Sequence, residues 1–212
     1  MNLLRFRSLL VSAAVLGLAA PALAGPPLLC FPFEIGQARS LPVGAGSWQA
    51  IDTKYDSSRL VDDTTALLTP ATPVIVRMET LRRATLYAAK NPAQAAALLD
   101  RLQQRASVSD ANAALAVFDF GYLVETYKQA SYLFGHPYTA VQAIDGYSLV
   151  SKAAAMSGDA GVDFALAVMT RDRTRGTDVY RAHLAKVLAA APGNRLIDAN
   201  LSKQFGNDLE TR

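Results

Sequence analysis

From residue 74 onward, apolar residues recur every three or four positions, which is the spacing of one face of an α-helix. The stretch 92–106 shows this most clearly, because its apolar stripe comprises Ala95, Leu98, Leu99, Leu102 and Ala106. Proline, glycine and asparagine interrupt the pattern at intervals. We therefore expect about seven helices and no strand, at 74–90, 92–106, 110–131, 140 or 147 to 156, 162–171, 178–191 and 195–205.

The segment 110–131 is apolar on nearly every face, which is typical of a helix at the centre of its domain. Its start is marked by Ser109 and Asp110, either of which can cap a helix. Short gaps between helices favour antiparallel neighbours. The pattern thus predicts an all-α fold of stacked antiparallel helical hairpins.

Residues 25–73 differ in composition from the rest. Prolines and glycines recur between residues 26 and 46, which disfavours helices there. However, apolar side chains such as Phe31, Phe33 and Trp48 are too numerous for a free tail. We expect an extended Pro/Gly-rich N-terminal arm that packs over the helices, with one short helix within 57–68.

Residues 1–24 have the pattern of a cleavable signal peptide. Arg5 and Arg7 precede an apolar run over 8–20, and Ala22-Leu23-Ala24 follows Pro21 as a small-x-small cleavage site. A retained membrane anchor is the alternative, but the run is shorter than the roughly 20 residues that a spanning helix needs. The sequence thus predicts a signal peptide at 1–24, an arm at 25–73 and a helical domain at 74–212. It predicts an exported protein, periplasmic or secreted, without stable membrane insertion.

The signal peptide accounts for part of the basic charge. The whole chain has 21 Lys+Arg and 18 Asp+Glu, and both leader arginines are among the 21. The mature chain is close to neutral, so its charge does not support a nucleic-acid partner. The single cysteine, Cys30, lies among apolar neighbours. We expect it to be buried and inert, although pairing with another molecule or a redox-reactive thiol stays open.

Two of the four glutamates in the chain, Glu79 and Glu125, lie within predicted helices. Basic residues follow each of them at the spacing of helical ion pairs. One interpretation is a set of structural pairs or a cross-helix network. The other is a polar groove for a ligand or partner, formed by Glu79, Arg83, Tyr122, Glu125, Tyr127 and Lys128.

The surroundings of these glutamates also show a short echo. Glu79-Thr80-Leu81-Arg82-Arg83-Ala84 aligns with Glu125-Thr126-Tyr127-Lys128-Gln129-Ala130, 46 residues later. This interval is close to that of a helical-repeat unit. There is no third copy, so chance similarity stays open.

A basic stretch follows the helix predicted at 162–171. Arg171, Arg173 and Arg175 flank Asp172 and Thr174 in a segment, 171–176, that we expect to be a loop. Three arginines could dock an anion or an acidic partner. A solvated loop without a partner is the alternative.

Sets of catalytic or metal-binding residues are incomplete. The chain has two histidines, His136 and His183, and no Glu-x-x-His or Cys-x-x-Cys spacing, so we expect no metal and no cofactor. Asp119-Phe120-Gly121 matches a kinase triplet but lacks the accompanying phosphate loop. Gly-x-Ser-x-Gly is absent. The sequence therefore favours a protein without enzymatic activity.

Three stretches, 30–36 (Cys-Phe-Pro-Phe-Glu-Ile-Gly), 77–84 (Arg-Met-Glu-Thr-Leu-Arg-Arg-Ala) and 121–128 (Gly-Tyr-Leu-Val-Glu-Thr-Tyr-Lys), resemble segments of exported all-helical bacterial proteins without an assigned function. That resemblance implies export and helices, and no activity. The helical region is also loosely similar to tetratricopeptide arrays in architecture. The Trp–Leu–Gly–Tyr pattern of those arrays is absent.

These observations predict an exported helical protein that binds or scaffolds in the cell envelope, with a protein or peptide partner and no nucleic acid. The alternative is an envelope hydrolase or lytic enzyme with a helix-borne glutamate as its acid. A glutamate with a raised pKa and no basic neighbour would favour the enzyme, whereas a glutamate bonded to arginine would argue against it. The sequence leaves the ligand and the oligomeric state open.

Overall fold

A computed structural model of the protein describes residues 27–135, 138–174 and 177–209. Within these residues the chain forms nine α-helices, three short 3-10 turns and no strand, which confirms the all-α class. The helices are α1 (Pro27–Cys30), α2 (Leu60–Leu67), α3 (Val74–Ala88), α4 (Pro92–Ala106), α5 (Ala113–Phe134), α6 (Gly146–Ser157), α7 (Ala160–Thr174), α8 (Asp178–Ala190) and α9 (Arg195–Leu209). The predicted signal peptide and His136 lie outside the described residues.

The helix ends follow local chemistry. The Asn91 side chain accepts a hydrogen bond from the Gln94 amide, and Pro92 fills the first position of α4. Gly158, with a φ of 64°, ends α6 in the left-handed conformation that glycine adopts without strain. The predicted cap at 109–110 is wrong, because the Asp110 carboxylate bonds the Asn112 amide in a turn and α5 begins at Ala113.

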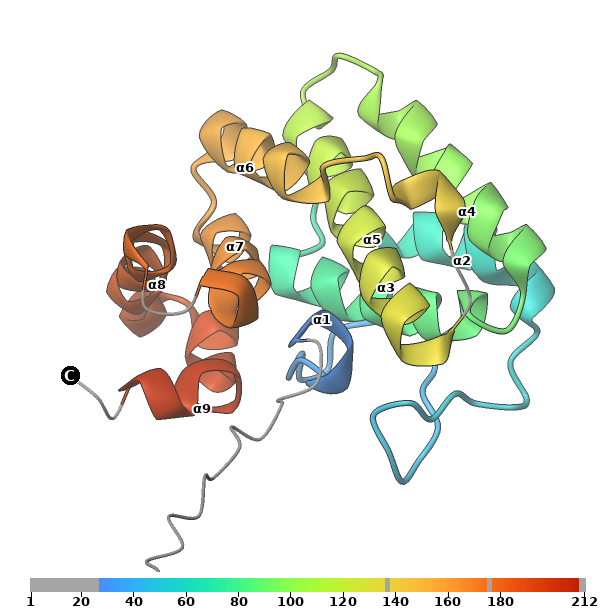
Figure 1. Ribbon diagram of the computed structural model, residues 1–212, viewed down its shortest axis with the longest axis horizontal. Coiled ribbons are helices and arrows are strands. Elements are labelled where there is room, and N and C mark those ends of the chain that lie inside the picture. The colour runs from blue at the N-terminus through green and yellow to red at the C-terminus, as the bar shows by residue number, and fades with distance from the viewer. Residues whose placement is uncertain (1–26, 136–137, 175–176, 210–212) are drawn as a thin grey trace, which may run out of the picture.

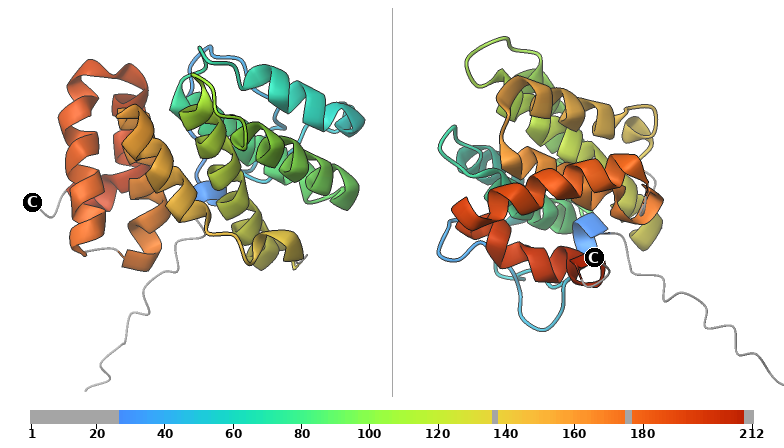
Figure 2. Two further views of the ribbon diagram at one scale, coloured as in Figure 1. Left: turned by 90° about the horizontal axis from the view of Figure 1, so that it is seen from above. Right: turned by 90° about the vertical axis from the view of Figure 1, so that its left-hand side faces the viewer.

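The helices gather in two groups (Figure 1). α2–α5 lie at one end of the molecule and α7–α9 at the other, with α6 between them, and the turned views in Figure 2 show the same division. α1 contacts both α5 and α7 and so lies between the groups. The central helix α5 contacts α3, α4 and α6, and twelve of its residues are buried. The prediction from its apolar pattern is therefore confirmed.

α5 and α6 approach each other closely at two glycines. A Cβ added to Gly146 would lie 2.5 Å from the Gly121 carbonyl oxygen, and one added to Gly121 would lie 2.7 Å from the Leu149 Cβ. Neither position has room for a side chain. This contact places the first turn of α6 directly against the middle of α5.

Residues 31–56 connect α1 to η1 (Ser57–Arg59) without a helix or strand, and we call them the connecting segment. Their apolar side chains enter the core, where the Phe33 ring meets the Phe164 ring edge-on at 6.3 Å between centroids. They also reach the last helix. The Glu34 amide donates to Asn200 Oδ1 at 2.7 Å, and the Gln204 side chain donates to the Phe31 carbonyl at 3.1 Å.

Candidate functional site

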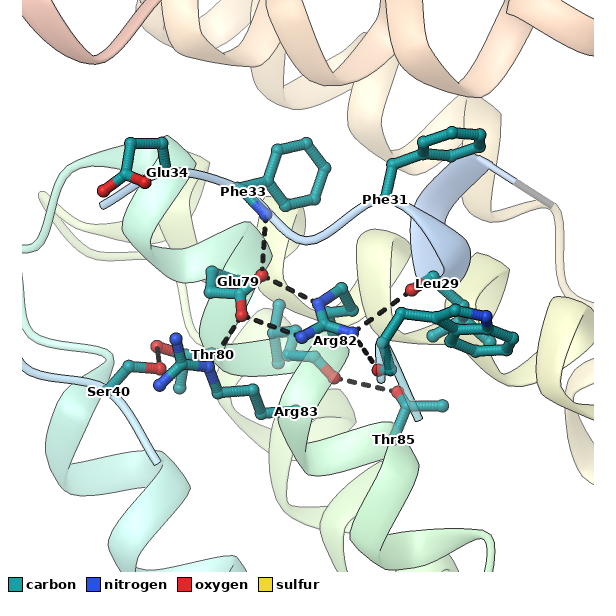
Figure 3. A network of polar contacts seen from close by, with 12 residues as sticks. Leu29, Phe31, Phe33, Glu34, Ser40, Glu79, Thr80, Arg82, Arg83 and Thr85 are labelled. Atoms are coloured by element: carbon teal, nitrogen blue, oxygen red, sulfur yellow. Dashed lines mark hydrogen bonds and ion pairs between the residues drawn. The ribbon is translucent and has the colours of Figure 1, made fainter. Parts of the chain in front are cut away.

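Glu79 on α3 is the centre of a buried polar network (Figure 3). Arg82 meets its carboxylate in a bidentate pair, with Nε at 2.8 Å from Oε2 and Nη2 at 2.9 Å from Oε1. Arg83 Nε donates to Oε1 at 2.7 Å, and the Phe33 amide donates to Oε2 at 3.0 Å. Both carboxylate oxygens therefore have partners. Burial opposes ionisation of Glu79, but the hydrogen bonds and charges of Arg82 and Arg83 outweigh it and lower its pKa.

The two arginines of this network hold α1 and the connecting segment by their carbonyl groups. Arg82 Nη1 donates to the Leu29 carbonyl at 3.2 Å and to the Trp48 carbonyl at 2.9 Å. Arg83 Nη1 donates to the Leu41 carbonyl at 2.6 Å. Glu79 accepts a hydrogen bond from a backbone N–H, and Arg82 and Arg83 donate to backbone carbonyls. We call Glu79, Arg82 and Arg83 the α3 clamp.

Glu125 and Lys128 on α5 repeat this arrangement. Lys128 Nζ donates to Glu125 Oε1 at 2.7 Å and to the Ile144 carbonyl at 2.6 Å, while the Gly146 amide donates to the same carboxylate oxygen at 3.1 Å. We call this pair the α5 clamp. The two clamps coincide with the two echoing sequences at 79–84 and 125–130. In both echoing sequences, therefore, a glutamate and the cation that follows it hydrogen-bond to backbone groups of another segment.

A surface pocket of about 360 Å³ lies beside the α3 clamp. Residues 39–42 of the connecting segment line one side, and residues from η1 and α2, together with Tyr55, line the other. Arg83 fixes the first wall through the Leu41 carbonyl, and Ser40 and Thr80 join their hydroxyls at 2.9 Å. The lining residues are Arg39, Ser40, Leu41, Pro42, Tyr55, Arg59, Asp63, Ala66 and Leu67.

The charges of the pocket do not cancel. Asp63 accepts from the Tyr55 hydroxyl at 2.9 Å and from Arg59 Nη2 at 3.0 Å. Burial, followed by the bond to Asp63 and its charge, raises the pKa of Tyr55, so its hydroxyl stays protonated. Arg39 forms no ion pair within the described part of the chain. The pocket therefore has one uncompensated guanidinium and an apolar wall.

The structure does not bring the six residues of the predicted groove together on one exposed surface, although Tyr122 lies close enough to Glu79 to feel its charge. Glu79 and Arg83 belong to the α3 clamp, and Glu125 and Lys128 lie at the junction of α5 with α6. Tyr122 and Tyr127 are fully buried, and burial raises the pKa of each well above its usual value. The Tyr127 hydroxyl donates to the Ala95 carbonyl at 3.2 Å. Neither tyrosine faces a groove, because α5 is covered by helices on most sides.

The arginine-rich stretch differs from the prediction. α7 continues through Thr174, so the expected loop at 171–176 is helical over most of its length. Arg171 is buried, donates to the Gln204 carbonyl, and its guanidinium lies 4.8 Å from the centroid of the Phe31 ring. The side chain of Arg173 and all of Arg175 lie outside the described residues.

A second buried ion pair went unnoticed in the sequence. Arg77 Nη1 donates to Asp119 Oδ2 at 2.7 Å, and both side chains are 1% exposed. Burial, opposed by the charge of Arg77 and its hydrogen bond, raises the pKa of Asp119 to about 6. The two residues are 42 positions apart. The only sequence signal was an acidic residue, Asp119, among the apolar residues at 115–118 and 120–124 of α5, which indicates a buried partner elsewhere in the chain.

No group of three or more histidine, cysteine or acidic side chains that could hold a metal ion occurs among the described residues. Within the same residues, no helix has the length and apolarity to cross a membrane. No protein-family model matches the chain, and neither a curated protein nor a solved structure is significantly similar to it.

Proposed function

We propose that this chain is an exported, non-enzymatic binding protein of the cell envelope, and that its pocket takes the free C-terminus of a peptide or protein. In this proposal the helices are stacked antiparallel hairpins, and the connecting segment is an N-terminal arm fixed by the α3 clamp. The arm provides one wall of the pocket, so the clamp determines the shape of the binding site.

Arg39 is the observation that carries the proposal. A guanidinium binds a carboxylate through two parallel hydrogen bonds, which makes arginine well suited to a terminal carboxylate. Pro42 and Leu67, which are both partly exposed, offer an apolar surface for the last side chain of the peptide. A volume of about 360 Å³ is at the small end of the usual range for ligand pockets. It suits a short peptide terminus better than a large cofactor.

The envelope hydrolase has less support from the geometry. A general acid must hold a proton near neutral pH, whereas two arginines lower the pKa of Glu79. Glu125 is bonded to Lys128 and to a backbone amide. Both carboxylates are engaged in holding backbone segments together, which supports a binding protein over a lytic enzyme.

Arg39→Gln is expected to weaken binding of peptides that end in a free carboxylate after a small apolar residue by about 10- to 100-fold, the loss typical of a hydrogen bond to a charged group. Fluorescence polarisation with a pool of labelled peptides ending in Ala, Val or Leu measures this loss. Arg101→Gln is the matched control, because Arg101 lies outside the pocket and pairs only loosely with Asp62, at 3.6 Å. Equal affinity for the same peptides with amidated C-termini would refute carboxylate recognition.

Export is tested separately from binding. The mature protein is expected to begin at Gly25, since Ala22-Leu23-Ala24 supplies the cleavage site. N-terminal sequencing and intact mass of the protein from a periplasmic or culture-medium fraction measure this. Ala24→Asp is expected to leave the precursor uncleaved, because the site requires a small residue there. Recovery of the uncleaved wild-type chain from the cytosol would contradict the proposal.

A further inference from the structure

Four polar side chains meet where α6, α7 and α8 contact one another, away from the pocket and the clamps. The Tyr147 hydroxyl of α6 lies 3.3 Å from His183 Nε2 of α8. His183 Nδ1 lies 3.4 Å from Asp163 Oδ1 of α7, and Lys186 Nζ donates to the same oxygen at 3.0 Å. This set could not be predicted from the sequence, because its members are spread over three helices.

The hydrogen bonds determine the role of each imidazole nitrogen. Asp163 is a carboxylate and accepts, so His183 Nδ1 carries the proton that faces it. In this neutral tautomer Nε2 has a free lone pair, which makes the Tyr147 hydroxyl the donor of their contact. A carboxylate that orients a histidine, which in turn accepts from a hydroxyl, is the arrangement that activates a nucleophilic oxygen.

The set lies at the protein surface. The side chains of His183 and Asp163 are 16% and 12% exposed, and that of Lys186 is 61% exposed. Tyr147 is half-buried. The set therefore lies beside partly exposed side chains, while the packing of three helices keeps the hydroxyl and its base in register.

We propose that Tyr147 is a nucleophilic hydroxyl, activated by His183 and oriented by Asp163, that accepts an acyl group from an activated ester. The phenolic oxygen attacks the ester carbonyl carbon, and its proton passes to His183 Nε2. The bond from the carbonyl carbon to the leaving oxygen then breaks, and that oxygen departs as an alcohol with the proton from His183. Tyr147 is left as an acyl ester, and no oxidant, reductant or metal is required.

The test uses p-nitrophenyl acetate as the acyl donor and the intact protein as the acceptor. Peptide mapping by mass spectrometry gives the rate of acetylation at each tyrosine. Tyr132 is an internal control, because it is 80% exposed and has no hydrogen-bonding partner among the described residues. We expect Tyr147 to be acetylated faster than Tyr132, despite its lower exposure. Faster or equal acetylation of Tyr132 would overturn the proposal without any mutation.

Variants then separate activation from a purely structural role. His183→Gln is expected to lower the rate at Tyr147 by about 10²-fold, the usual contribution of a general base, and to leave the rate at Tyr132 unchanged. Asp163→Asn is expected to give a smaller loss, because the base stays but loses its orientation. Tyr147→Phe removes the acceptor and the acetylated peptide with it. An unchanged Tyr147 rate in folded His183→Gln, checked by near-UV circular dichroism, would show that the histidine only joins helices.

Discussion

Glu79→Gln is expected to lower the free energy of unfolding by about 3–5 kcal/mol, the usual cost of removing one partner of a buried ion pair. The substitution keeps the shape of the side chain but removes its charge. Arg82, which is 1% exposed, would then be left as an uncompensated buried cation. The Phe33 amide would also lose its charged acceptor. Urea denaturation measures the difference.

The control for this loss is Arg101→Gln, which breaks the exposed contact with Asp62 and should cost under about 1 kcal/mol. Trp48 supplies a second readout, since it is the single tryptophan and its carbonyl accepts from Arg82. We expect its emission to shift to the red in Glu79→Gln, as the connecting segment loosens. Unfolding free energies of wild type and Glu79→Gln within about 1 kcal/mol of each other would show that the network does not hold the fold together.

Asp119 should make the protein less stable as the pH rises between about 4 and 6. Its pKa of about 6 in the folded protein exceeds the ordinary value of 3.8, so the folded state keeps a proton that the unfolded chain has released. Raising the pH through this window therefore favours the unfolded chain, by up to about 3 kcal/mol in total. In Asp119→Asn this fall should be absent. Urea denaturation at a series of pH values compares the two slopes, and the absolute stabilities need not match.

Glu79 has the opposite effect on the pH dependence of stability, and its effect lies at lower pH. Its pKa is lowered from 4.5 in the folded protein, so its contribution is present above 4.5 and is lost as the pH falls through the folded value. The two buried carboxyls together predict a stability maximum near pH 4–5 for their combined contribution.

Parallel slopes for wild type and Asp119→Asn between pH 4 and 6 would contradict the assignment of the pH dependence to Asp119.

The helices could be predicted because their signals are local. The stripe on α4, the Asn91-Pro92 start and the Gly158 end are each set by residues within a few positions of one another. Spacing also predicted the pairs of Glu79 with Arg82 and Arg83 and of Glu125 with Lys128. These pairs support the interpretation of the two glutamates as structural.

The partners that lie far along the chain could not be predicted in this way. The carbonyls of Leu29, Leu41 and Trp48 carry no sequence signal, because every residue has one. The burial of Tyr122 and Tyr127 depends on which helices cover α5. The prediction of a loop at 171–176 was wrong for a related reason. Arg171 is stabilised in α7 by Gln204 and Phe31, which lie far away in sequence.

The bonds between the connecting segment and α9 also constrain the order of folding. The Glu34 amide and Asn200 are 166 residues apart, and Phe31 and Gln204 are 173 residues apart. These contacts close most of the chain into a loop, so we expect them to form after the local helical contacts. A chain still being synthesised lacks α9 and cannot complete this closure. The final compaction of the fold therefore waits until α9 has been made.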